Sequence, residues 1–164
     1  MPFDAAASLD STIMDNTLRG LYRDNADHAT SGTGEDTLAS TTITGGTVGA
    51  TGLLHVIAAG TLTAGNETKT IKLYLGATAI GTVVRATTNA QDWRIDAWIC
   101  NTSASAQRIA VLFSTTDAAT ISADYITAAI DTSANVILKV TGECSSGTAV
   151  ITQTMFDVFV CQIS

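Results

Sequence analysis

The sequence predicts an all-β protein: an antiparallel two-sheet sandwich of jelly-roll type, preceded by an N-terminal arm that contains a short helix. From residue 35 onward, short runs of β-branched residues alternate with clusters of Gly, Asn, Ser and Thr, as strands alternate with turns. No long helical period and no propeller or solenoid repeat interrupts these eight or nine runs, which suits two packed sheets in one domain. An immunoglobulin-like sandwich is the alternative, although its typical Cys–Trp–Cys arrangement is absent.

Residues 1–34 differ from the rest in charge and periodicity, so we expect them to form the arm and residues 35–164 to form the sandwich domain. Apolar side chains recur there at spacings of three and four, as on one face of a short helix, with Asp10 or Ser11 available as its N-cap. A helix this short needs a surface to dock on, either its own domain or a partner. Residues 25–34 have the composition of a flexible polar connection. The candidate interface residues of the helix are Leu9, Ile13, Leu18, Leu21 and Tyr22.

Nine strands are expected after the arm. Each is a run of residues with high β-propensity, and turn-forming residues separate it from the next. The expected strands are residues 36–43, 52–62, 68–75, 79–85, 92–100, 108–114, 121–128, 135–142 and 150–162.

The strand expected at residues 150–162 is apolar on both sides. Alternation places Phe156 and Val158 on one side, and Met155 and Phe159 on the other. An antiparallel strand that meets water usually keeps one polar side, so this one requires a second layer, a neighbouring subunit, or both. Charged residues are only 14% of the composition, against about 25% in an ordinary soluble domain. We therefore interpret the chain as a subunit of an assembly.

The strand expected at residues 92–100 has two distinct sides. Trp93 and Ile95 belong to a face that we expect to lie in the core, whereas Arg94, Asp96 and Trp98 share the opposite face. A large indole beside a charge pair indicates contact with a neighbouring molecule or a ligand, unless a loop or the arm covers it. Trp98 is therefore a candidate interface residue.

The charge distribution argues against nucleic acid as a partner. The formal net charge is −7; residues 1–36 contain seven acidic residues and two arginines, a balance of −5, which leaves −2 for the rest. Phosphate binding needs clustered Lys and Arg, and the sequence has no such cluster. No apolar run reaches the length of a membrane span, and the first residues lack the features of a secretory signal. We expect no membrane partner and folding in a cytoplasm.

The sequence offers little that would support catalysis. Cys100, Cys144 and Cys161 lack metal-ligand spacing and are expected to be free, buried thiols. His28 and His55 are far apart, and the apolar run around His55 predicts a core or interface histidine. Phosphate loops, dinucleotide fingerprints, zinc-protease motifs and nucleophile elbows are not found. We expect neither an enzyme nor a bound cofactor or metal.

Four segments together resemble the small β-sandwich structural proteins of tailed bacteriophages. The resemblance covers residues 35 to about 100 best. It implies a jelly-roll component of the virion that assembles as a homotrimer, either as cement on the capsid shell or as part of a fibre or spike. The segments are residues 35–43, 49–56, 58–61 and 68–76.

The resemblance leads to one functional hypothesis and two alternatives. The first is a capsid cement or decoration protein whose trimer binds the major capsid protein or other virion proteins, with residues 1–34 reaching onto the shell. The second is a tail fibre or spike tip on which Trp98 and Tyr74 contact a host glycan. The third, from another class, is a free carbohydrate-binding module.

Overall fold

Eleven β-strands and no helix make up the part of the chain that the computed structural model describes, residues 18–116 and 122–162. The seven-stranded sheet contains β1 (Arg19–Asp24), β2 (His28–Ala29), β4 (Leu53–Leu62), β7 (Gln91–Ser103), β8 (Ala106–Thr115), β9 (Ser122–Ala128) and β11 (Ile151–Cys161). The four-stranded sheet contains β3 (Glu35–Ile43), β5 (Gly65–Leu75), β6 (Thr78–Thr87) and β10 (Val136–Cys144).

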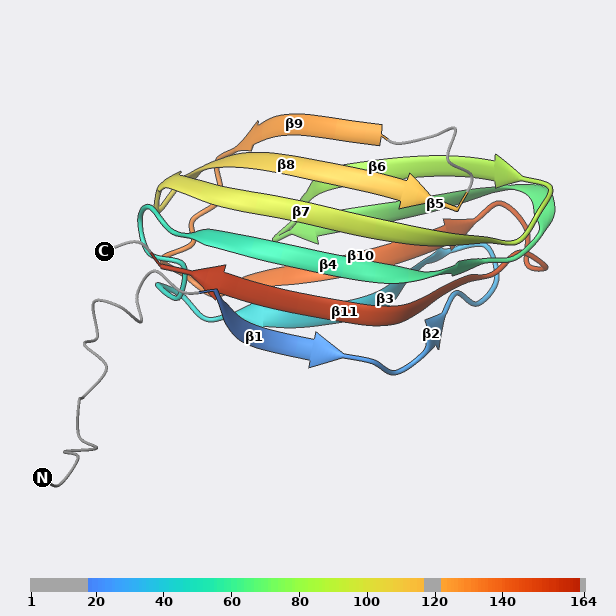
Figure 1. Cartoon of the computed structure of the whole chain (residues 1–164), viewed down its shortest axis with the longest axis horizontal. Coiled ribbons are helices and arrows are strands. Elements are labelled where there is room, and N and C mark those ends of the chain that lie inside the picture. Colours follow the sequence, from blue (N-terminus) through green and yellow to red (C-terminus); the bar gives the residue numbers. More distant parts are fainter. Residues whose placement is uncertain (1–17, 117–121, 163–164) are drawn as a thin grey trace, which may run out of the picture.

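The two sheets lie one over the other as a sandwich (Figure 1). The larger sheet has the order β1-β11-β4-β7-β8-β9, with β2 also pairing with β11, and the smaller has the order β3-β10-β5-β6. Every ladder between these strands is antiparallel. The predicted all-β, antiparallel two-sheet sandwich is therefore confirmed, and each of the nine expected strands corresponds to one of β3 to β11 with shifts of a few residues at the ends.

Side chains from both sheets form the core, as strand alternation requires. On β7, Trp93, Ile95, Ala97 and Ile99 point inward and are at most 3% exposed, whereas Trp98 is 41% exposed on the other side. The predicted faces of this strand are confirmed. On β11, Phe156, Val158 and Val160 are buried inward, while Met155 and Phe159 lie half-buried on the outside. The main inward contributors of the smaller sheet are Ile71, Leu73, Leu75, Leu138 and Val140.

The helix predicted in the arm is wrong within the described residues. Residues 19–24 form β1, which pairs with the edge of β11. The spacing of Leu18, Leu21 and Tyr22 fits a helix, but an edge strand satisfies the free hydrogen-bonding groups of β11 and packs Leu21 and Tyr22 on the core. The Tyr22 ring meets Phe156 edge-on, with centroids 5.9 Å apart. Leu9 and Ile13 lie outside the described residues.

The connection predicted as flexible is instead bound to the sandwich. The backbone N–H of Thr30 donates to the carbonyl of Ile151 at 3.0 Å, and its hydroxyl accepts from the N–H of Ile151 at 3.0 Å. Thr30 is 7% exposed, and β2 just before it pairs with β11. The described residues before 35 therefore pack as part of the sandwich.

We expect Gly60→Ala to destabilise the fold, because a Cβ at this position would collide with the backbone carbonyl of Thr152 on β11. The β4–β11 register already shifts between Gln153 and Met155, and rigid ladder backbone cannot move aside easily. The free energy of unfolding in urea should fall by about 3 kcal/mol. Gly20→Ala is the matched control, since a Cβ there meets nothing within 4 Å. Equal stability of the two variants would contradict this packing.

Candidate interaction surface

The outward side chains of β11, β4, β7, β8 and β9 form a flat surface, here called the outer sheet face. Trp98, Leu112 and Tyr125 lie on it and are 41%, 44% and 67% exposed. They belong to two neighbouring rows that run across the strands. The first row is Phe159, His55, Trp98, Ala110 and Tyr125, and the second is Asp157, Ile57, Asp96, Leu112 and Ala123.

His55 fixes the position of Trp98 on this face. The two rings are stacked, with centroids 3.8 Å apart and planes 9° from parallel. His55 Nε2 lies 2.8 Å from Asp96 Oδ1, and since a carboxylate only accepts, Nε2 carries the proton. Arg94 Nη2 donates to the other oxygen of Asp96 at 2.9 Å. Because each group holds the next, the exposed indole keeps one orientation.

His55 is a buried histidine that supports the ring of Trp98. The residue is 9% exposed, and its Nδ1 atom is buried without a hydrogen-bond partner. Among the described residues, the ring is hydrogen-bonded to the carboxylate of Asp96 and to no Ser, Thr or Cys side chain. The arrangement orients an aromatic surface, which is what binding requires.

A second ion pair lies at the border between the outer sheet face and β1. Arg23 of β1 donates from Nε to Asp157 Oδ1 at 2.8 Å and from Nη2 to Oδ2 at 3.2 Å. The hydrogen bonds and the charge of Asp157 raise the pKa of Arg23. The pair covers Asp157, which is 7% exposed despite facing outward.

Tyr74 lies on the other sheet and belongs to a polar cluster. Lys72 donates to Glu35 Oε2 at 2.8 Å, Thr141 donates to Glu35 Oε1 at 2.6 Å, and the Lys139 ammonium lies 4.8 Å from the centre of the Tyr74 ring. The hydrogen bond from Lys72, followed by that from Thr141, lowers the pKa of Glu35 from 4.5 to about 2. Burial and the Glu35 carboxylate raise the pKa of Tyr74. An open depression of about 310 Å³ adjoins the cluster.

The structure separates residues that the sequence hypothesis had combined. Trp98 is on β7 of the larger sheet and Tyr74 is on β5 of the smaller sheet, so the two face opposite sides of the sandwich and cannot form one glycan site. Leu21 and Tyr22 pack against the core of their own chain, and Leu18 is 48% exposed just before β1. Trp98 is the proposed interface residue that the described part of the chain places on the outer sheet face.

Two exposed apolar residues of this face were missed from the sequence, although a signal for them exists. Alternation in β8 sets Arg108, Ala110 and Leu112 opposite the buried Ile109 and Val111. The same reasoning applied to β9 leaves Tyr125 outside. What the sequence could not supply is that β7, β8 and β9 are neighbours, which places these side chains beside Trp98.

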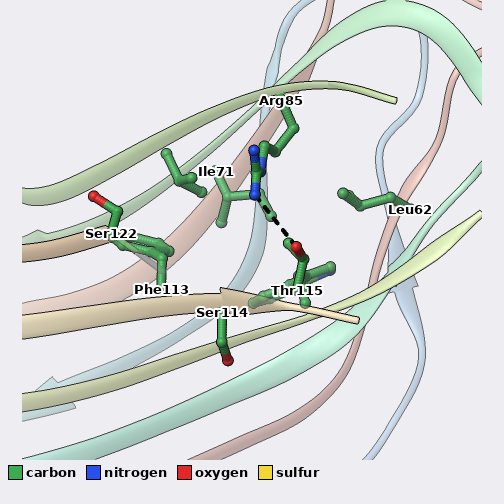
Figure 2. A pocket seen from close by; sticks show the side chains of 9 residues that line it. Leu62, Ile71, Arg85, Phe113, Ser114, Thr115 and Ser122 are labelled. Atoms are coloured by element: carbon green, nitrogen blue, oxygen red, sulfur yellow. Dashed lines mark hydrogen bonds between the residues drawn. The ribbon is translucent and has the colours of Figure 1, made fainter. Parts of the chain in front are cut away.

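A cavity between the two sheets, beside Leu62 and Phe113, is too small for a ligand. Figure 2 shows Arg85 and Thr115 joined by a hydrogen bond of 3.3 Å at its edge, beside Ile71 and Phe113. Its volume is about 10 Å³, enough for at most one water molecule. It is a packing defect in the core and not a substrate pocket.

The structure also places other side chains that could react or bind a metal. Lys69 is fully buried, and its ammonium donates to the carbonyls of Gly65 and Glu67 at 3.2 and 3.4 Å. The three cysteines are free, as expected, although only Cys144 is fully buried. Within residues 18–116 and 122–162, no cluster of His, Cys, Asp and Glu could hold a metal ion. The same residues include no helix with the length and hydropathy of a membrane span.

Comparison with known proteins assigns no role to these surfaces. No protein-family model matches the chain, and no curated protein matches it.

We expect Asp96→Asn to loosen Trp98, because the neutral amide loses the ionic contact with Arg94 and holds His55 less firmly. Because the Arg94 side chain is half exposed and water screens the ion pair, the free energy of unfolding should fall by only about 1 kcal/mol. Tryptophan fluorescence anisotropy should fall while circular dichroism is unchanged. Asp92→Asn, on the same strand and face, should leave both signals as in the wild type. An unchanged anisotropy in Asp96→Asn would contradict the proposed positioning of the indole.

We expect acid to remove the stabilisation that Glu35 provides. Because its pKa in the folded chain is lowered to about 2, the carboxylate stabilises the fold fully above pH 4.5, and this contribution disappears as the pH falls toward 2. Glu35→Gln should lower the free energy of unfolding by about 1 kcal/mol at pH 7, since water screens this surface pair, and by nothing near pH 2. Glu143→Gln is the control, because its carboxylate lies 3.8 Å from the same ammonium. A difference that persists at pH 2 would refute the assignment.

Proposed function

We propose that this chain is a structural protein of a bacteriophage virion, a capsid cement or decoration protein that works as a homotrimer bound to the major capsid protein. The outer sheet face carries this proposal. It exposes Trp98, Leu112 and Tyr125 around Ala110 on three neighbouring strands, on a face that would ordinarily be polar in an isolated antiparallel sandwich. Such a face suits a protein whose role is to bury surface against others.

The role would be mechanical. A cement protein adds buried area between capsid subunits and so resists expansion of the shell, and a few thousand Å² per trimer is ample for stable binding. The sandwich is suited to this role because its long antiparallel ladders make a stiff unit. The sequence resemblance of residues 35 to about 100 to phage β-sandwich proteins supports the same proposal.

A jelly-roll winding is part of the proposal. The consecutive strands β4 and β5 pass from the larger to the smaller sheet, and β10 and β11 pass back, with β10 beside β5 and β11 beside β4. This paired crossing is what a jelly roll needs. The outer strands differ from a simple jelly roll because β7, β8 and β9 extend the larger sheet as a meander.

A fibre tip or carbohydrate-binding module is the second candidate, and one observation favours it. An open depression of about 410 Å³ lies on the outer sheet face near the ends of β4 and β7, two alternate positions along β7 from Trp98. Hydroxyl groups and the charged Arg94 and Asp92 line it, and such groups hydrogen-bond sugar hydroxyls. Tyr74 plays no part in this version, since it faces the opposite side.

We expect virions that lack this protein to assemble but to lose heat and osmotic tolerance, because the shell loses the area that cement buries. Infectious titre after a temperature series, and after dilution from high salt, measures the loss. Adding back the purified protein should restore the tolerance.

Protein lacking residues 1–17 tests the arm, whereas removing residues 1–34 would also delete β1 and β2. The shorter deletion should fold but fail to restore tolerance if the arm grips the shell. Particles of unchanged tolerance, together with a glycan-dependent rise in the melting temperature of the isolated protein, would replace the first function with the second.

A further inference from the structure

Together with Arg23 of the adjoining β1, the outer sheet face has no net charge, unlike the chain as a whole. The outward charges are then three arginines and three aspartates, and four of these six residues form two ion pairs. The chain carries −7 in total, so two copies have net charges of the same sign and repel one another at long range. On this face that repulsion is absent. The six residues are Arg23, Arg94, Arg108, Asp92, Asp96 and Asp157.

Two of the ion pairs are already satisfied within the chain. Arg23 binds Asp157 with two hydrogen bonds, and Asp96 is shared by Arg94 and His55. A strongly charged partner would find few free charges to pair with. A nucleic acid or an anionic membrane requires clustered cations, so neither fits this face. A partner with an equally neutral contact surface does fit.

The size of the face matches the contact between two protein copies. From β11 to β9 it spans five strands, which is about 24 Å at about 4.8 Å per strand. The ten residues of β4 give its length, about 33 Å. The resulting area of about 800 Å² is what each partner contributes to a stable interface of standard size.

Where β8 and β9 form the face, large and small side chains alternate, which suits packing against another sheet. In the first row the small Ala110 separates Trp98 from Tyr125, and in the second row Leu112 stands beside Ala123. An opposing sheet can place its large side chains over the alanines and receive the large ones between its own. Each copy carries both kinds of position, so one surface can serve both sides of a contact around a two-fold axis. Such a contact joins copies in pairs, and the trimer of the proposed function needs a further contact elsewhere on the chain.

Trp98 is prepared for such a contact before binding. Its stack on His55, and the hold of Asp96 on His55, restrict the indole in the free chain. Less side-chain entropy is then lost on association, and aromatic residues near the centre of an interface often dominate its affinity.

We infer that the outer sheet face is the contact surface between copies of this chain, with a second copy as its occupant. This inference rests on the proposed function in so far as that function needs self-assembly. It specifies the surface through which the copies bind. Trp98, Leu112 and Tyr125 are the central contacts, whereas Ile137 and Val84 of the smaller sheet take no part in the contact.

The test compares two single variants, each of which introduces one arginine on a different sheet. Leu112 and Ile137 are exposed large aliphatic residues, 44% and 52%, on the larger and the smaller sheet. Leu112→Arg should raise the dissociation constant for self-association, measured by sedimentation velocity, by about 100-fold, because a hydrated guanidinium would be forced into the middle of the contact. The facing carboxylate of Asp96 offsets little of this cost, since it already binds His55 and Arg94. Ile137→Arg should leave it unchanged. Unfolding in urea checks that both variants fold.

A second measurement needs no substitution. Cys100 and Cys161 lie half-buried on the outer sheet face, and Cys144 is buried in the core. Raising the protein concentration should slow alkylation of the first two several-fold and leave the third unreactive throughout.

The outcomes separate this inference from the proposed function. If Ile137→Arg dissociates the assembly and Leu112→Arg does not, or if both dissociate it, the inference is overturned while a virion role stands. A wild type that is monomeric yet binds particles, and loses that binding with Leu112→Arg, assigns the face to another virion protein and also overturns the inference. Self-association through Leu112 without any effect on particles upholds the inference and removes the proposed function.

Discussion

The structure depends on the position of β11, which is hydrogen-bonded on both edges and covered on one side by the second sheet. Its ladder with β4 joins it to the meander β7, β8 and β9, and its other edge holds β1 and β2. Inward, Phe156 and Val158 are completely buried. Because the side-chain period of a strand is two, a slip of one residue would turn these core residues outward and Asp157 inward. The register of this one strand therefore fixes the core and the outer sheet face together.

The strands could be predicted because β-propensity and side-chain alternation depend on residues that are close together in the sequence. Alternation in β7 assigns Trp93 to the core and Trp98 to the outside without any knowledge of neighbours, and the structure agrees. The two-sided apolar character of β11 likewise follows from its own residues. Its inner side lies in the core, and its outer side contributes Phe159 to the aromatic row. Turn-forming residues between strands gave the boundaries to within a few positions, since end residues depend on pairing partners as well as on composition.

The predictions that were wrong concern features that depend on contacts between residues distant in sequence. Leu18, Leu21 and Tyr22 have the spacing of a helical stripe, and only the unpaired edge of β11, more than a hundred residues later in the chain, makes a strand the better solution. In the same way, nothing local assigns Tyr74 and Trp98 to different sheets, because the order of strands in space is set by crossovers. For the same reason the outer sheet face could be predicted only in part. Alternation identifies Trp98 as an exposed residue, but Leu112 and Tyr125 come close to it only through the pairing of β7 with β8 and of β8 with β9.

The same central strand constrains the timing of synthesis. β4 and β1 leave the ribosome long before β11, so each waits with an open edge in the place that β11 will fill. An open edge can accept a strand from any nascent chain nearby. Translation on crowded messages would therefore favour exchange of β11 between molecules, and a pause before this strand is made would lengthen the period of risk.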